Sequence, residues 1–280
     1  METITAIATS LSTSITALFQ RINTNRFSYL IYPAALAGAV GSFFLARAAR
    51  ADYKTYLSYG PGGPPYNVLG WFVTSTVVRA MTIDGFDLRK CDKDLDRRTW
   101  LGPDWEKGAE KHVRTGGRPK IGPHPAPQRQ LDQLPGREVQ EKLLASFTSI
   151  VAHNPTLVQF KPSIYERRHE AIFIADTCPV TTKDVLGYPL PAEISHIHAT
   201  TDYSVHVVLS PRDAATVIRA GWGQLHGLAG LSVAGITVLP KSYVLLYAPR
   251  NEDEVHVVME IVRASIGYMT QTEMEGVKPA

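Results

Sequence analysis

The sequence predicts an α+β fold: one small mixed α/β domain with a histidine-bearing β-hairpin, preceded by a single transmembrane helix. Three observations predict it. An uncharged run occupies residues 27–46. The second half of the chain then reads as strand, strand, helix, strand, helix. Two of these strands alternate around a short turn and carry three histidines. We therefore expect a polar segment at 1–26, a transmembrane helix at 27–49 and a folded domain at 50–280.

The uncharged run is long enough to cross a bilayer. It extends from Phe27 to Ala46 between flanking arginines, and a spanning helix needs about 20 apolar residues. Tyr32 lies near one end, where amphipathic rings favour the membrane interface. A cleaved signal peptide would have a shorter polar region and a shorter apolar core. The run therefore predicts a retained anchor.

Basic residues on the two sides of the run indicate its orientation. Arg47, Arg50 and Lys54 follow it closely, whereas Arg21 and Arg26 precede it. The side with more basic residues tends to stay in the cytosol. We expect a single-pass protein of the endoplasmic reticulum membrane with a cytosolic C-terminal domain.

The composition is that of a folded protein from a reducing compartment. Hydrophobic residues make up 44% of the chain and charged residues 20%, which is ordinary for a globular domain. A net charge of +3 without any nucleic-acid-binding motif argues against a nucleic-acid partner. Cys91 and Cys178 form neither a CxxC pair nor a dense framework, which argues against a disulfide-stapled fold.

The first part of the domain is predicted to be irregular. Residues 52–57 continue the helix, and the glycines and prolines of 59–65 end it. Residues 68–80 are apolar and β-branched, and their periodicity does not decide between helix and strand. Residues 84–136 are polar and rich in Gly, Pro and Arg, so we expect a loop-rich segment wrapped over the domain.

The second part has clear elements. A helix is expected over 138–151, where apolar residues recur at helical spacing. Ser210 and Pro211 begin a second helix as its cap and first residue, and Asn251 caps a third, followed by three acidic residues. Strand-like runs occupy 157–160, 171–175, 193–199, 203–210 and 243–247.

Histidines concentrate in the hairpin region. His196 and His198 lie two apart on one strand and therefore point to the same face. If the turn holds residues 199–203, His206 pairs with His196, with side chains roughly 5 Å apart. His226 follows in a glycine-rich segment, 221–230, which we expect to be a loop just past the second helix.

This histidine group is suited to two kinds of chemistry. One is a metal site at His196, His198 and His206, because neutral imidazoles bind Zn, Fe, Cu or Ni; Glu193 or Asp202 could add a carboxylate. The other is metal-free acid–base chemistry, because histidine titrates near neutral pH and can take a proton from an acidic enol or phenol. The spacing does not choose between the two.

Other catalytic motifs are absent from the sequence. It contains no HExxH, no GxSxG elbow, no phosphate-binding loop and no dinucleotide fingerprint. We therefore expect no organic cofactor. If the protein is an oxygenase, either its substrate donates electrons to O2 itself or a histidine-bound divalent metal assists.

Several segments match one known family. Residues 221–230, with the pattern GWGxxHxLAG, match one of its motifs, and 247–270 match its C-terminal segment. The HxH pattern of 196–198 with His206, and the segment just after the anchor, also match. The chain thus resembles the fungal luciferase family over most of its length, most closely over 193–270, which we take as the core motif region.

The resemblance implies a specific reaction. The family oxidises 3-hydroxyhispidin, a hydroxylated α-pyrone, with O2 through an endoperoxide; CO2 is lost and an excited product emits light. No flavin, nicotinamide or ATP takes part in that step. The chain departs from the luminous pattern in its turn, 199–202, and at Gly227, where a proline is expected.

Roles follow for individual residues on this interpretation. One of the three hairpin histidines would deprotonate a hydroxyl of an aromatic or polyketide-like substrate, and His226 would protonate or position the peroxide. Arg250 would hold the substrate anion, Trp222 would stack on its ring and Tyr247 would contact it. Two alternatives stay open. One is a non-luminous enzyme of secondary metabolism, metal-dependent or metal-free. The other is a membrane-tethered module that binds a small molecule or a metal.

Overall fold

The computed structural model describes residues 2–107 and 112–280, with side chains described from Thr13 onward apart from residues 19, 22–29, 106 and 107. The chain divides into two compact units, Met1–Thr55 and Tyr56–Ala280. Each unit is described separately below.

The first unit consists of a single long helix, α1 (Glu2–Ser58), which continues into the second unit. Among the described residues, one stretch of it, Leu30–Ser58, is long and apolar enough to cross a membrane. Side chains 30–48 are all exposed. The polar segment 1–26 belongs to the same helix from Glu2 onward, so the predicted anchor is not a separate element.

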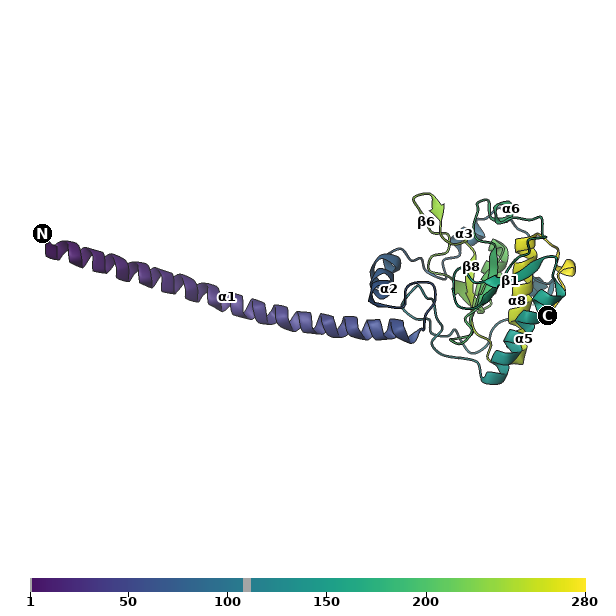
Figure 1. The fold of residues 1–280 in the computed structure, drawn as a ribbon, viewed down its shortest axis with the longest axis horizontal. Helices are drawn as coiled ribbons and strands as arrows, with labels where there is room; N and C mark the ends of the chain where they lie inside the picture. The colour runs from purple at the N-terminus through teal and green to yellow at the C-terminus, as the bar shows by residue number, and fades with distance from the viewer. Residues whose placement is uncertain (1, 108–111) are drawn as a thin grey trace. The chain divides into compact units, whose positions relative to one another are not determined.

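The second unit is built on a six-stranded antiparallel sheet (Figure 1). Its strand order is β1-β2-β3-β4-β8-β5. The histidine strands β3 and β4 therefore lie at the centre, where neighbours on both sides hold them in place. The strands are β1 (Val158–Pro162), β2 (Glu170–Ile174), β3 (Glu193–Ile197), β4 (Val205–Val208), β5 (Gly223–Leu225) and β8 (Tyr243–Leu246).

Helices cover one face of this sheet. The C-terminal helix α8 (Glu252–Thr270) packs on β2, β3 and β4, and α5 (Arg137–His153) packs on α8 and β1. Figure 1 shows both helices beside the sheet. Side chains alternate between the two faces of a sheet along each strand. Residues such as Ile197 on β3 and Val207 on β4 join the apolar core, so the neighbouring histidines belong to the opposite face.

Both predicted helix caps are present. The Asn251 side chain accepts a hydrogen bond from the Glu254 backbone N–H at 2.9 Å. Ser210 accepts one from Asp213 at 3.1 Å and begins α7 (Pro211–Arg219), with Pro211 in its first turn. Such side-chain oxygens satisfy backbone donors that the first turn leaves unpaired.

In one region the structure settles what the sequence left open, and in another it differs from the sequence-based expectation. Residues 68–80, which periodicity left undecided, are helical: α2 (Val68–Val73), capped by the Asn67 side chain, runs into a π-helical segment, η1 (Thr74–Val78). The expected loop 221–230 contains β5. Gly223 explains that difference, because a Cβ on it would lie 2.4 Å from the carbonyl oxygen of Leu245; only glycine lets the two backbones approach so closely.

The remaining short elements carry no clear sequence signal. The loop-rich segment holds only two helical turns in its described residues, α3 (Arg89–Asp92) and α4 (Asp104–Lys107), in agreement with the prediction. Elements of two to five residues bury too little periodic surface to be recognised from pattern alone. They are α6 (Thr182–Leu186), β6 (Ser232–Val233), β7 (Ile236–Thr237) and η2 (Met274–Gly276).

Candidate active site

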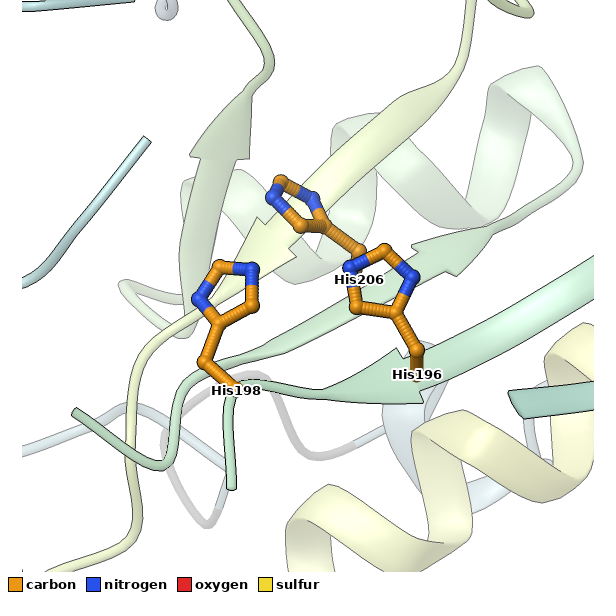
Figure 2. A group of neighbouring side chains, drawn as sticks. All are labelled: His196, His198 and His206. Carbon is orange, nitrogen blue, oxygen red and sulfur yellow. The ribbon is translucent and has the colours of Figure 1, made fainter. Parts of the chain in front are cut away.

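Three histidines meet on the sheet face opposite the helices. His196 lies directly across from His206 in the β3–β4 pair, and the His198 backbone N–H donates to the Ser204 carbonyl at 2.9 Å. This is the register that the sequence predicts. The ring centroids are 4.9–5.3 Å apart, and one nitrogen from each ring lies within 4.8 Å of the others. Figure 2 shows the three rings turned toward one another.

His196 is oriented by a buried carboxylate. Its Nδ1 lies 2.6 Å from Glu193 Oε1. The carboxylate is held by Ser163 Oγ at 2.9 Å and by the Ile164 backbone N–H at 2.7 Å. Because an ionised carboxylate only accepts hydrogen bonds, His196 Nδ1 carries the proton. In the neutral ring, Nε2 is then an unprotonated acceptor.

His198 is oriented in the same way by the turn. Its Nδ1 lies 2.9 Å from Ser204 Oγ and 3.2 Å from Asp202 Oδ1. Ser204 Oγ donates its only proton to Asp202 at 2.8 Å, so His198 Nδ1 must be the donor. The Gln130 backbone N–H holds the other Asp202 oxygen at 2.6 Å. His198 therefore also presents an unprotonated Nε2.

His226 has the opposite tautomer. The Leu228 backbone N–H donates to its Nδ1 at 3.0 Å, so the proton of the neutral ring is on Nε2 and that atom is a donor. The ring lies 5.4 Å from that of His206. His206 itself is stacked flat on Tyr243, with centroids 4.8 Å apart. The four histidines thus supply two oriented acceptors and one oriented donor.

Burial keeps these rings neutral. The pKa values of His198 and His206 lie well below the ordinary value, first because the rings are out of water and then because Arg129 and the other histidines oppose the addition of a further proton. Burial, reinforced by His196, lowers the pKa of His226 to about 3. At neutral pH these three imidazoles are therefore uncharged, as ligands of a metal or acceptors of a proton must be.

A pocket opens onto the histidines. The space inside it, including its open mouth, is about 590 Å³. All four histidines line it, and most of the exposed lining is apolar. The wall includes Tyr165, Tyr243, Leu228, Val238 and Leu239. The pocket is therefore suited to a flat, mainly apolar molecule with a few polar groups.

Three polar residues of the wall were not predicted from the sequence. Arg129 and Glu166 form a fully buried ion pair at 2.8 Å, and Gln128 is next to it. Burial raises the pKa of Glu166, and Arg129 opposes the shift. Arg129 lies in the loop-rich segment, where no periodicity marks a residue as buried. Only the packing of that loop over the sheet shows that Arg129 is buried.

The three predicted substrate-binding residues lie elsewhere. Trp222 is buried and donates from Nε1 to the His112 carbonyl. The Tyr247 hydroxyl donates to Gln224 at 3.2 Å, and Arg250 is paired with Glu254. None of the three is part of the pocket wall. Their contact with substrate stays a prediction that these contacts do not support.

Known proteins are similar to this chain over most of its length. A family model described as a luciferase domain matches residues 191–265. The chain is 34% identical to a luciferase of Armillaria gallica over 244 residues, 85% of this chain and 87% of the relative. It is 32% identical to a luciferase of Neonothopanus nambi over 268 residues, 92% of this chain and 94% of the relative. The chain belongs to the fungal luciferase family.

The matched luciferase domain contains the whole histidine group. Residues 191–265 include β3, β4, α7, β5, β8 and most of α8, and thus all four histidines. Membership of the luciferase family implies an enzyme that catalyses an oxygen-using reaction. No solved structure matches this chain.

Proposed function

We propose that this luciferase-family chain is an oxygenase that acts with O2 on a hydroxylated α-pyrone of the 3-hydroxyhispidin type. The observation that carries the proposal is the pocket itself. It combines oriented imidazole acceptors and a donor with an apolar, aromatic wall. Curated relatives that are luciferases support the same reaction class.

Unsatisfied polar atoms favour a hydroxylated ligand. Gln128 Oε1, His206 Nδ1 and the Tyr243 hydroxyl are buried without a hydrogen-bond partner, and all three residues line the pocket. Buried polar groups in native proteins are almost always paired. Hydroxyl and carbonyl groups of a pyrone would supply the missing partners, while the Tyr165 and Tyr243 rings form part of the apolar wall.

The tautomers suggest how protons move. An unprotonated Nε2, on His196 or His198, accepts the proton of the acidic ring hydroxyl. The electron-rich anion then reacts with O2, which adds across the ring to form an endoperoxide. The O–O bond breaks as CO2 leaves. Two electrons form the endoperoxide and two more cleave its O–O bond; all four come from the substrate, so no external reductant or organic cofactor is needed. His226 Nε2–H lies on the same pocket wall and donates to the peroxide oxygen.

A direct assay tests this proposal. The full chain, in detergent micelles or native membranes, is incubated with 3-hydroxyhispidin under air while photons and CO2 are recorded. Light together with CO2 is the expected result, and both should vanish without O2. CO2 without light would replace the luminous reaction with a dark oxygenase. Substrate left unchanged would reject this substrate class and favour a binding module.

We also propose that residues 27–49 anchor the protein in the endoplasmic reticulum membrane with its C-terminal domain in the cytosol. The exposed apolar stretch of α1 supports an anchor, and the basic residues after it support the orientation. A glycosylation acceptor fused after Ala280 should stay unmodified in cells, and the protein should resist extraction at alkaline pH. Glycosylation of that C-terminal acceptor would reverse the orientation, and extraction into the soluble fraction would exclude a spanning anchor.

A further inference from the structure

We propose that His196, His198 and His206 together bind one divalent first-row transition-metal ion. This inference goes beyond the proposed function, because metal binding requires no pyrone substrate. A histidine whose free nitrogen binds the ion is not the acceptor of the substrate proton. Four features of the site lead to it.

The first feature is the geometry of the three rings. Their candidate ligand nitrogens lie within 4.8 Å of one another. In a tetrahedral centre with bonds of about 2.0–2.1 Å, ligand nitrogens are roughly 3.3 Å apart. Rotation of the rings about their side-chain bonds closes such a gap without movement of the strands. His196 and His206 are held on two central strands in a fixed register, and His198 follows directly after β3, so the backbone is already in place.

The second feature is the group on the far nitrogen of two rings. Glu193 accepts from His196 Nδ1, and Asp202 with Ser204 accepts from His198 Nδ1. Metal-bound histidines almost always donate their other N–H to a carboxylate, a carbonyl or water, which aims the free nitrogen at the ion. The carboxylates expected from sequence as direct ligands therefore take this supporting position.

The third feature is a charge imbalance. Glu193 and Asp202 are both buried, and among the described residues their only ion-pair partners within 4.0 Å are the histidines. The neighbouring Glu166 already has Arg129. Two buried carboxylates that form no ion pair with a lysine or arginine are costly. A divalent cation held by three neutral imidazoles supplies two compensating charges.

The fourth feature is His206, whose Nδ1 has no hydrogen-bond partner among the described residues. The residue is 4% exposed, and its ring stacks on Tyr243. A coordinate bond to a metal ion would give the His206 ring the partner that it lacks.

The ligand chemistry identifies the class of ion. Imidazole nitrogens favour first-row transition ions over Mg²⁺ or Ca²⁺, which prefer oxygen. Three protein ligands leave coordination positions open, as in catalytic rather than structural sites. Because the three rings line the pocket, those positions face the space where a substrate oxygen would bind.

Metal content of the unmodified protein gives the first test. The full chain is purified in detergent through a tag without histidines, and elemental analysis is expected to find about one transition ion per chain. After chelation, added Co²⁺ should produce visible d–d absorption, and X-ray absorption should detect imidazole ligands. An absence of metal together with no Co²⁺ spectrum would overturn the proposal without reliance on any variant.

Variants locate the ion. His196→Ala and His206→Ala should each abolish stoichiometric Co²⁺ binding, and Glu193→Gln should weaken it by about 10–100-fold. His256→Ala is the matched control, because His256 is exposed on α8; it should bind as the unmodified chain does. Unchanged binding in folded His196→Ala and His206→Ala proteins would place the ion elsewhere and reject the site.

Metal binding and catalysis can fail separately. A metal-loaded chain that leaves 3-hydroxyhispidin unchanged would retain this inference and reject the substrate. A chain that binds no metal and no Co²⁺ but turns the pyrone over at full rate would retain the oxygenase and reject this inference.

Discussion

His198→Ala is expected to lower kcat/KM for the pyrone by at least about 100-fold, the range associated with loss of an acid–base group. His198 presents an unprotonated Nε2 to the pocket, and Asp202 and Ser204 aim it there. Alanine removes this nitrogen whether it accepts a proton or binds a metal. Oxygen consumption and photon yield under substrate-limited conditions measure the loss.

Two further variants separate chemistry from folding in this experiment. His198→Gln keeps a polar side chain of similar length and should be equally inactive if an imidazole is required. His256→Ala should keep normal turnover because that side chain is exposed on α8. A folded His198→Ala protein with normal kcat/KM would rule out a catalytic hairpin histidine at this position.

Arg129→Met is expected to lower the free energy of unfolding by about 3–5 kcal/mol. Arg129 and Glu166 are both buried, with 2.8 Å between their charged groups. Removing one partner leaves an uncompensated charge inside the protein. Arg129 also donates to the Tyr59 carbonyl at 3.2 Å, so its loss loosens the segment that enters the domain. Denaturant unfolding of the detergent-solubilised chain measures the change.

An exposed ion pair provides the comparison. Arg137 and Glu141 are joined at 2.8 Å on the outside of α5, and Arg137→Met should change stability by no more than about 0.5 kcal/mol. The double variant Arg129→Met with Glu166→Gln should recover part of the loss, because no buried charge is left alone. Equal effects of the buried and exposed substitutions would show that burial of the Arg129–Glu166 pair contributes little.

Local patterns accounted for much of the domain. The hairpin register followed from the two-residue period of the strands and the length of the turn, so His196 could be placed opposite His206 without a structure. The helix caps at Ser210 and Asn251 could also be predicted from the sequence, since they depend on residues a few positions apart. A short edge strand such as β5 was missed, because its partner β8 lies about twenty residues away and a glycine supplies no pattern.

The histidine hairpin separates what local sequence predicts from what only the fold decides. By itself, the sequence determined that three imidazoles share one face, because side chains alternate along a strand. Only the tertiary structure decided what surrounds them. Arg129 arrives from a loop about seventy residues upstream, and Glu166 from the connection between β1 and β2. Those contacts depend on how irregular segments pack over the sheet. Because the residues that meet are far apart in the sequence and lie in loops, no periodic sequence pattern predicts their burial or their pairing.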